Sequence, residues 1–309
     1  MDNVCHTLVG AAIGHTGLKR RTRFAQGALM ISANVPDLDV LIFLTDVPSV
    51  AFRRGWTHGV LAQALLPVLV TGAFWAVDRL RPRRAVDTPP FNPVWMLLLA
   101  YVGVYSHVLL DLLNNYGVRL LTPLEWRWFY GDAVFIIDPW LWLALGAGVW
   151  LARRQRSSRP ARWAVGVAAC YIALVVGSAR MARDIVADEW RREHGTSPRA
   201  LMVGPRPVTP LVRDVIVDAG DSYAVGVFDW GARGVRWEEQ RLPKNDQRPE
   251  VAEARNDPAV QAFLVWSRFP FWRLEPDGAG TRVTVGDARF ITAVRGFAAS
   301  VVIAAPKGS

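Results

Sequence analysis

The sequence predicts an α-helical integral membrane domain of about six helical segments, residues 1–181, followed by a smaller β-rich (α+β) domain outside the membrane, residues 182–309. Two observations support this fold class. Apolar residues make up 51% of the chain and concentrate before residue 181, in stretches that approach the roughly 20 residues needed to cross a bilayer. After residue 181 the chain is charged, is interrupted by Pro and Gly, and contains short alternating runs that are typical of strands.

The membrane domain is expected to begin with a short helix and to continue with five full spans. The opening segment, 4–18, is rich in Gly and Ala, and it lacks the basic start and the cleavage site of a signal peptide. The five spans are expected at 24–44, 59–77, 94–106, 134–151 and 163–179, and each carries few or no charged residues.

The distribution of Lys and Arg predicts the orientation of these spans. The connections 19–23, 79–84 and 153–162 hold 13 of these residues, whereas 45–57 and 114–133 hold four. By the positive-inside rule, the first three are expected to face the cytoplasm. The protein is therefore expected to be a multi-pass protein of the inner membrane with its C-terminal domain outside the cytoplasm. Trp95, Trp150 and Trp163 mark the inner boundary. The net charge of +9 is then a feature of topology, and the expected partner is the lipid bilayer rather than nucleic acid.

Four short runs are expected to become strands in the C-terminal domain: 215–217, 223–228, 263–266 and 282–285. The run 282–285 is expected to belong to a hairpin over 271–290, because the turn 277–280 contains two glycines between two alternating runs.

His107 and Asp111 are the strongest local pair of candidate metal ligands. A spacing of four residues places both side chains on one helix face, about 5–6 Å apart at Cβ, which suits ligands of one metal or of adjacent metals. The alternative is a His–Asp pair that only satisfies itself between helices. An ionisable residue at membrane depth is costly, which favours a functional role.

Asp37 and Asp39 are two residues apart and would diverge on a regular helix. Pro36 removes a backbone donor and disfavours helix at Val35, so a break is expected here. A broken helix at membrane depth is tolerated where it lines a polar cavity, and there both carboxylates can reach inward. One would bind metal, and the other would bridge or support a ligand. The alternative for one of them is to cap the next helix.

Topology adds two histidines to this group. His58 opens the span 59–77 behind Thr57, its expected N-cap, although a lone His at such a place is more often an interfacial side chain. His6 lies 13 residues before the basic turn at 19–23, and Asp37 lies 14 residues after it. An antiparallel hairpin therefore brings both to a similar depth, toward the side of His58 and Asp111. His15 faces elsewhere and is left out.

Six motifs follow one another in the first half of the chain: His6, Pro36-Asp37-Leu38-Asp39, Arg54-Gly55-Trp56-Thr57-His58, Ser106-His107-x-x-x-Asp111, Asn115-Tyr116-Gly117 and Ile137-Asp138-Pro139. In this order and spacing they resemble the LexA-regulated membrane-bound metal-dependent hydrolase family over roughly residues 1–150. The family often has His where this chain has Arg53. The succession of ligands is also similar to the first ligands of zinc-dependent phospholipase C, but the second His-x-x-x-Glu pair is missing, so the resemblance implies one or two metals.

Imidazoles combined with carboxylates favour zinc, or another borderline first-row metal, over magnesium. The predicted function is a membrane-bound hydrolase that cleaves a phosphoester or related ester, including a lipidic one, with water activated by the metal. Two alternatives stay open: a transporter coupled to divalent cations or protons, and a non-catalytic envelope protein with a structural metal. The predicted ligands are His6, Asp37, Asp39, His58, His107 and Asp111, of which Asp39 and Asp111 are also catalytic, and Arg53, Arg54 or Arg119 would bind the substrate.

Overall fold

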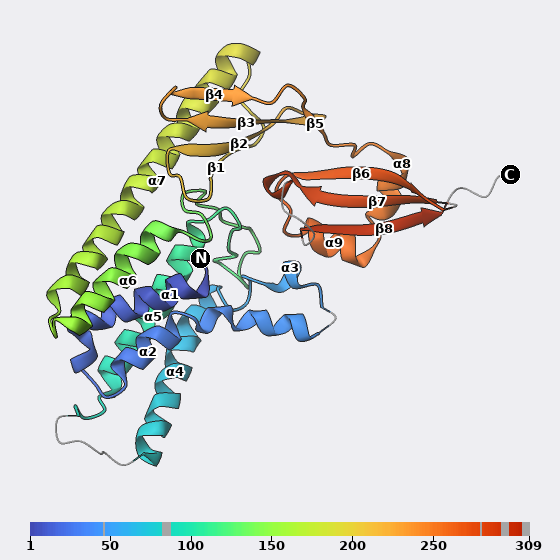
Figure 1. Ribbon diagram of the computed structural model, residues 1–309. Helices are drawn as coiled ribbons and strands as arrows, with labels where there is room; N and C mark the ends of the chain where they lie inside the picture. The colour runs from blue at the N-terminus through green and yellow to red at the C-terminus, as the bar shows by residue number, and fades with distance from the viewer. Residues whose placement is uncertain (46, 82–87, 279, 292–296, 305–309) are drawn as a thin grey trace. The chain divides into compact units, whose positions relative to one another are not determined.

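A computed structural model describes residues 1–45, 47–81, 88–278, 280–291 and 297–304 (Figure 1). The chain separates into two compact units, which we call the helical unit and the β unit. The helical unit comprises Met1–Leu41, Arg53–Ser178 and Pro207–Thr209, and the β unit comprises Ile42–Phe52, Ala179–Arg206 and Pro210–Ser309. The sequence placed the division after residue 181 and assigned 42–52 to the membrane domain. In the structure this segment belongs to the β unit, where its helix α3 (Ser49–Phe52) packs against α9 (Pro258–Leu264).

In the helical unit, α1 packs on α2 and α6, and α5 packs on α2 and α4 (Figure 1). The pairs α1–α2 and α4–α5 are antiparallel, whereas α1–α6 and α2–α5 run in the same direction. The predicted hairpin of α1 and α2 is present, and it turns through the short 3-10 helix η1. The elements are α1 (Asn3–His15), η1 (Leu18–Arg20), α2 (Ala25–Ser32), the 3-10 helix η2 (Val35–Leu44), α4 (Val60–Leu80), α5 (Pro93–Leu112), α6 (Pro139–Arg154) and α7 (Arg159–His194). Residues 159–178 of α7 belong to this unit.

Among the described residues, three helices are long and apolar enough to cross a membrane: α4, α5 and α7. A fourth span is reached if α2 and η2, which are bent by 51° relative to each other, count as one. The predicted count of about six segments is therefore not confirmed. Within the segment predicted to span 134–151, the helix begins only at Pro139, because Asp138 caps it by accepting hydrogen bonds from the amides of Trp140 and Leu141.

Two glycines allow the helices around α2 to approach closely. A Cβ on Gly10 of α1 would lie 2.7 Å from the carbonyl oxygen of Leu29, and a Cβ on Gly103 of α5 would lie 2.5 Å from the Cβ of Ser32. Small residues at such contacts let helix backbones pack tightly in a membrane protein. His6 and His107 are each four residues from one of these glycines, so they lie on the same helix faces as the close contacts.

The β unit contains two antiparallel sheets. The first has the order β1-β2-β3-β4, with β5 also paired to β3, and the second has the order β6-β7-β8. The strands are β1 (Leu201–Pro205), β2 (Val212–Asp218), β3 (Ser222–Asp229), β4 (Gly234–Trp237), β5 (Leu242–Pro243), β6 (Pro270–Asp277), β7 (Gly280–Asp287) and β8 (Ala298–Ala304), with helices α8 (Pro249–Ala254) and α9 and the 3-10 helix η3 (Ala288–Phe290).

The core of the β unit forms where helix α7 packs on the first sheet. Ala182, Val186 and Trp190 of this helix lie against strand residues that include Val215 and Phe228. These apolar side chains recur at helical spacing on α7, so burying them against the sheet stabilises both elements. The predicted β-rich character of this region is thereby confirmed.

The hairpin prediction over 271–290 is confirmed, since β6 and β7 pair antiparallel from Pro270 opposite Asp287 to Asp277 opposite Gly280. Ala279 of the predicted turn lies outside the described residues. The prediction of a strand at 263–266 was wrong, because helix α9 occupies the start of this run. Asp257 caps α9 through the amides of Ala259 and Val260, and a proline follows it at the first helical position.

Candidate metal centre

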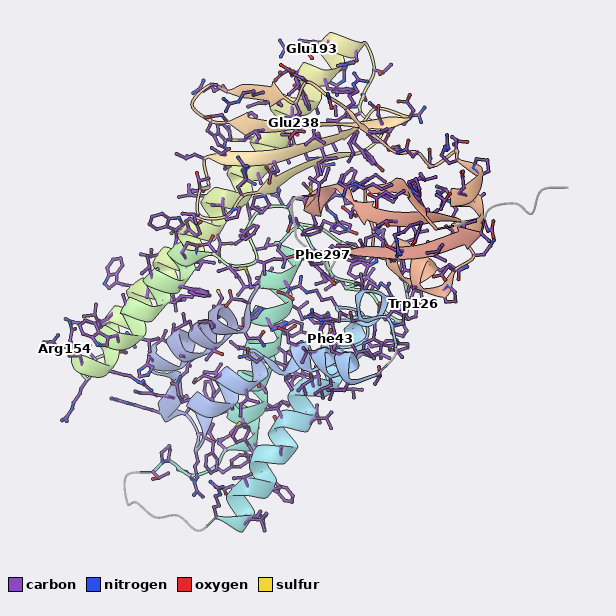
Figure 2. The ribbon with its side chains drawn as sticks, turned by 45° about the vertical axis from the view of Figure 1, so that its right-hand side comes forward. Phe43, Trp126, Arg154, Glu193, Glu238 and Phe297 are labelled. Carbon is purple, nitrogen blue, oxygen red and sulfur yellow. The ribbon has the colours of Figure 1, made fainter. Side chains whose placement is uncertain are left out.

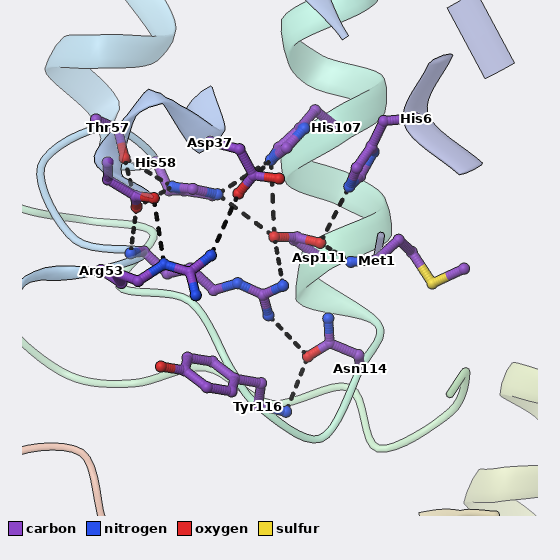
Figure 3. A network of polar contacts seen from close by, with 12 residues as sticks. Met1, His6, Asp37, Arg53, Thr57, His58, His107, Asp111, Asn114 and Tyr116 are labelled. Atoms are coloured by element: carbon purple, nitrogen blue, oxygen red, sulfur yellow. Dashed lines mark hydrogen bonds and ion pairs between the residues drawn. The ribbon is translucent and has the colours of Figure 1, made fainter. Parts of the chain in front are cut away.

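Four buried side chains from three separate parts of the helical unit converge at one point (Figure 3). Asp37 comes from η2, His58 from the turn before α4, and His107 and Asp111 from one face of α5. One nitrogen or oxygen atom of each lies within 4.8 Å of the corresponding atom of every other. The helix break expected at Pro36 and the i,i+4 pair of α5 are thus what bring these groups together.

His107 is oriented by the end of helix α2. Its Nδ1 lies 2.8 Å from the carbonyl oxygen of Ala33, the C-cap residue of α2. A carbonyl accepts only, so Nδ1 of His107 carries the proton and the neutral ring presents a lone pair at Nε2. Because α2 ends here, this carbonyl is free of the helix and available to the histidine.

His58 is oriented in the same way by Thr57 and Asp39. The Thr57 hydroxyl donates to Oδ2 of Asp39 at 3.0 Å, so its oxygen accepts from Nδ1 of His58 at 2.9 Å. Nε2 of His58 is then also a lone pair in the neutral ring. Burial lowers the pKa of His58 well below its ordinary range, and the nearby His107 and Arg54 lower it further, so the neutral ring is favoured.

The lone pairs of the two histidines face each other. Nε2 of His58 lies 3.1 Å from Nε2 of His107 and 3.4 Å from Oδ2 of Asp111. Nε2 of His107 lies 3.7 Å from the same oxygen of Asp111 and 3.8 Å from Oδ1 of Asp37. A tetrahedral site with ligand bonds of about 2.1 Å separates its ligand atoms by about 3.4 Å. Four electron-rich atoms at these separations repel one another unless a cation lies among them, so the residues fit a divalent metal.

His6 and Asp39, the other two predicted ligands, lie beside this group rather than within it. The ring of His6 stacks on that of His107, with centroids 3.8 Å apart, and its Nε2 lies 3.3 Å from Oδ1 of Asp111. The same oxygen contacts the amino nitrogen of Met1 (Figure 3). Three buried atoms of this region have no hydrogen-bond partner among the described residues: both ring nitrogens of His6 and Oδ1 of Asp37. Asp39 instead accepts a hydrogen bond from the Thr57 hydroxyl, which orients His58.

Arg53 and Arg54 surround the carboxylates of the cluster. Nη2 of Arg54 lies 2.9 Å from Oδ2 of Asp111, and its Nη1 donates to Oδ1 of Asn114 at 3.1 Å. Arg53 lies 3.5 Å from Oδ1 of Asp39 and 3.9 Å from Oδ1 of Asp37, and its side chain is 26% exposed. Burial lowers the pKa of Arg54 to about 10. Arg54 is therefore a buried partner of the site, whereas Arg53 lies at its edge.

Arg119 differs from both. Its guanidinium carbon lies 4.7 Å from the ring centre of Trp128 and 5.6 Å from that of Trp126, and its backbone amide donates to the carbonyl oxygen of Arg54 at 2.9 Å. The residue is 5% exposed, yet its Nε and Nη2 have no hydrogen-bond partner in the described part of the chain. A buried guanidinium group with unpaired donors is available for an anion.

Sequence reasoning missed one functional side chain and misassigned the role of another. Asn114 receives hydrogen bonds from Arg54 and from the backbone amides of Tyr116 and Gly117, and so it fixes both the arginine and the turn after α5. Its place next to the Asn-Tyr-Gly motif was the available signal. Thr57 was predicted to cap α4, but the N-cap is Gly59, and the Thr57 hydroxyl serves Asp39 and His58 instead.

The fold and this cluster define a membrane protein whose helical unit encloses buried His and Asp side chains able to hold a metal ion. The chain belongs to the YdjM inner membrane protein family, whose family model matches residues 1–182. The inner-membrane part of the sequence prediction is thereby confirmed, whereas hydrolase activity and similarity to zinc-dependent phospholipase C stay predictions. No curated protein and no solved structure matches the chain.

Proposed function

We propose that this protein is a membrane-bound metal-dependent hydrolase that cleaves a phosphoester or a related ester. Asp37, His58, His107 and Asp111 would hold one divalent metal, of which zinc fits a mixed nitrogen and oxygen donor set best. His6 and Oδ1 of Asp111 offer the beginning of a second position. When bound, such a metal lowers the pKa of water to around 7 and stabilises negative charge on a phosphoryl oxygen.

The observation that carries this proposal is the facing pair of imidazole nitrogens. Nε2 of His58 and Nε2 of His107 are 3.1 Å apart, and each ring has its other nitrogen committed to a separate acceptor. Outer partners that fix the tautomer of a histidine in this way are typical of metal ligands. In a pair that only satisfies itself, one of the two nitrogens would donate to the other, and neither outer acceptor would be needed.

The remaining residues would position the reacting groups rather than react. Asp39 and Thr57 keep the proton of His58 on Nδ1 and so preserve its ligand atom. Arg54 neutralises part of the charge of Asp111, and Asn114 keeps the guanidinium in place. Arg119 would receive the phosphate of the substrate, because its Nε and Nη2 have no hydrogen-bond partner among the described residues, whereas Arg54 is already engaged.

A second candidate, a structural metal, is favoured by the burial of the cluster. His58, His107 and Asp111 are fully buried, and Asp37 is 6% exposed. A structural site is fully ligated by protein, whereas a catalytic site keeps a position for water or substrate. Activity therefore separates the two candidates, and metal content alone does not.

The test combines both measurements on purified protein. We expect wild type to contain metal by elemental analysis and to hydrolyse a generic phosphodiester, and we expect His107→Ala to lose both. His15→Ala is the control, since His15 lies outside the cluster, and it should retain both. Metal without hydrolysis in wild type would establish the structural role, and full activity in His107→Ala would refute the proposed site.

The orientation of the site is part of the same proposal. We infer from the distribution of Lys and Arg that the cluster opens toward the outer side of the inner membrane and that the C-terminal region also lies there. Arg83 and Arg84, which contribute to that distribution, lie outside the described residues. An outward site favours a substrate in the outer leaflet or in the space beyond it.

A further inference from the structure

A cavity of the helical unit lies apart from the metal centre, where α1 and α6 end and α7 begins. It has a volume of about 810 Å³ and is lined by residues 15–21, 26, 152, 153, 156–158 and 162. His6 belongs to the metal centre and His15 to this cavity, and their separation of nine positions corresponds to about 13 Å along α1. Arg154, labelled in Figure 2, marks the same end of the unit.

The lining is strongly basic. Among the described residues, it includes six exposed cationic side chains and no Asp or Glu. The neighbouring Arg23, which is not part of the lining, shows the contrast, because it forms an ion pair with Asp78 at 2.8 Å. The six cations are Lys19, Arg20, Arg21, Arg153, Arg156 and Arg162.

The helix ends do not account for this much positive charge. Each helix C-terminus carries about half a negative charge and each N-terminus about half a positive charge. The C-termini of α1 and α6 and the N-terminus of α7 therefore leave about half a negative charge at the cavity, which one cation would balance. The excess of cations over helix-end charge indicates that the cavity is complementary to an anion.

Both the size and the surroundings of the cavity narrow the choice of anion. Its volume falls in the range of about 300–1,000 Å³ that is typical of small-molecule sites. Trp150 near the end of α6 and Trp163 near the start of α7 are 57% and 76% exposed. Exposed tryptophans at the ends of membrane helices lie at the level of lipid headgroups, and clusters of four to eight Lys and Arg there are typical of anionic lipid sites.

We propose that this basic cavity binds the phosphate of an anionic ligand, and that the headgroup of an anionic phospholipid supplies it. Thr16, Gln26, Ser157 and Ser158 add polar groups to the lining that can bind the phosphate or the neighbouring hydroxyls of such a headgroup. The site is separate from the metal centre and does not depend on the proposed hydrolysis.

The test uses two charge-matched double variants of the full chain in neutral detergent. Arg20→Gln/Arg153→Gln removes two exposed cations that line the cavity, and Arg154→Gln/Arg159→Gln removes two exposed cations of the same region that do not. Native mass spectrometry measures the retention of phosphatidylglycerol, with phosphatidylcholine as the lipid without net charge. Each cation near an anionic headgroup contributes about a factor of five in affinity, so the cavity variant should bind phosphatidylglycerol about 25-fold more weakly.

The outcomes separate the sources of phosphate. We expect wild type and the Arg154/Arg159 variant to retain phosphatidylglycerol equally and in preference to phosphatidylcholine. Binding of inorganic phosphate alone, lost in the cavity variant, would keep the phosphate site and overturn the lipid assignment. Equal weakening in both double variants would show a general effect of charge, and no weakening in the cavity variant would also overturn the proposal.

Discussion

Replacing Thr57 by valine should weaken metal binding although the hydroxyl does not touch the metal. Valine keeps the shape of threonine but removes the acceptor of the Nδ1 proton of His58 and the donor to Asp39. His58 is fully buried, and Oδ2 of Asp39 is 3.7 Å from Nδ1, too far for a hydrogen bond. The proton is then better placed on Nε2, where Nε2 of His107 can accept it across 3.1 Å.

In that tautomer the ligand atom of His58 is blocked by its own proton. Binding a metal must break the new hydrogen bond and leave a buried Nδ1 proton unpaired, a penalty of about 1–3 kcal/mol. Loss of an outer partner of a metal-binding histidine typically weakens affinity by about 10–100-fold, or about 1.4–2.7 kcal/mol, which agrees with this reasoning.

The assay is competition for zinc with a chromophoric chelator, using purified wild type and Thr57→Val. Thr71→Val is the matched control, because the Thr71 hydroxyl also donates a hydrogen bond, at 2.7 Å, but to the carbonyl of Pro67 on α4. We expect the control to bind zinc as wild type does. An unchanged dissociation constant for Thr57→Val would refute the assignment of the His58 tautomer.

Three other predictions address packing, substrate binding and topology. Gly103→Ala should lower the free energy of unfolding by about 1–3 kcal/mol and reduce metal content, because the added Cβ would lie 2.5 Å from that of Ser32. The control Gly146→Ala should do neither, because the space around Gly146 is open. Equal unfolding temperatures of the two variants would contradict the close contact at Gly103. Arg119→Gln should raise KM for a phosphodiester about tenfold or more and leave metal content unchanged, and an unchanged KM would exclude phosphate binding there. A reporter fused after residue 309 should be detected outside the cytoplasm, and a cytoplasmic signal would reverse the orientation.

Most of the site could be predicted from the sequence because its residues follow helical spacing. His107 and Asp111 share a face through their spacing of four, and Pro36 indicates the irregular backbone that turns Asp37 inward. The depth argument for the first hairpin placed His6 near Asp111, and the structure has them 3.3 Å apart. Spacing and depth are local quantities, and they can be read from a single sequence.

The parts that could not be predicted depend on tertiary geometry. No sequence pattern shows that the carbonyl of Ala33 accepts a proton from His107, because any residue supplies a carbonyl. The roles of Thr57 and Asn114 depend on side-chain rotamers around a turn, and capping preference alone favoured a different role for Thr57. The start of α6 was misplaced because hydropathy extends across Asp138, whereas the side chain of that residue accepts hydrogen bonds from the amides of Trp140 and Leu141 and so begins the helix.

The balance of side-chain charge around the cluster argues for an anionic ligand rather than a closed structural site. Three carboxylates, those of Asp37, Asp39 and Asp111, face two guanidinium groups, those of Arg53 and Arg54, and the histidines are neutral in the tautomers described. Burial lowers the pKa of the Met1 amino group, which contacts Asp111, well below its ordinary range, so this group is counted as neutral. The site then carries one negative charge, and a divalent metal would leave one positive charge in a buried site. An uncompensated buried charge is costly, and a phosphodiester or carboxylate ligand would neutralise it. A purely structural zinc site would not need this excess of positive charge. An anion such as orthovanadate or phosphate should therefore stabilise the metal-loaded protein against thermal unfolding, and it should have no such effect once the metal has been removed.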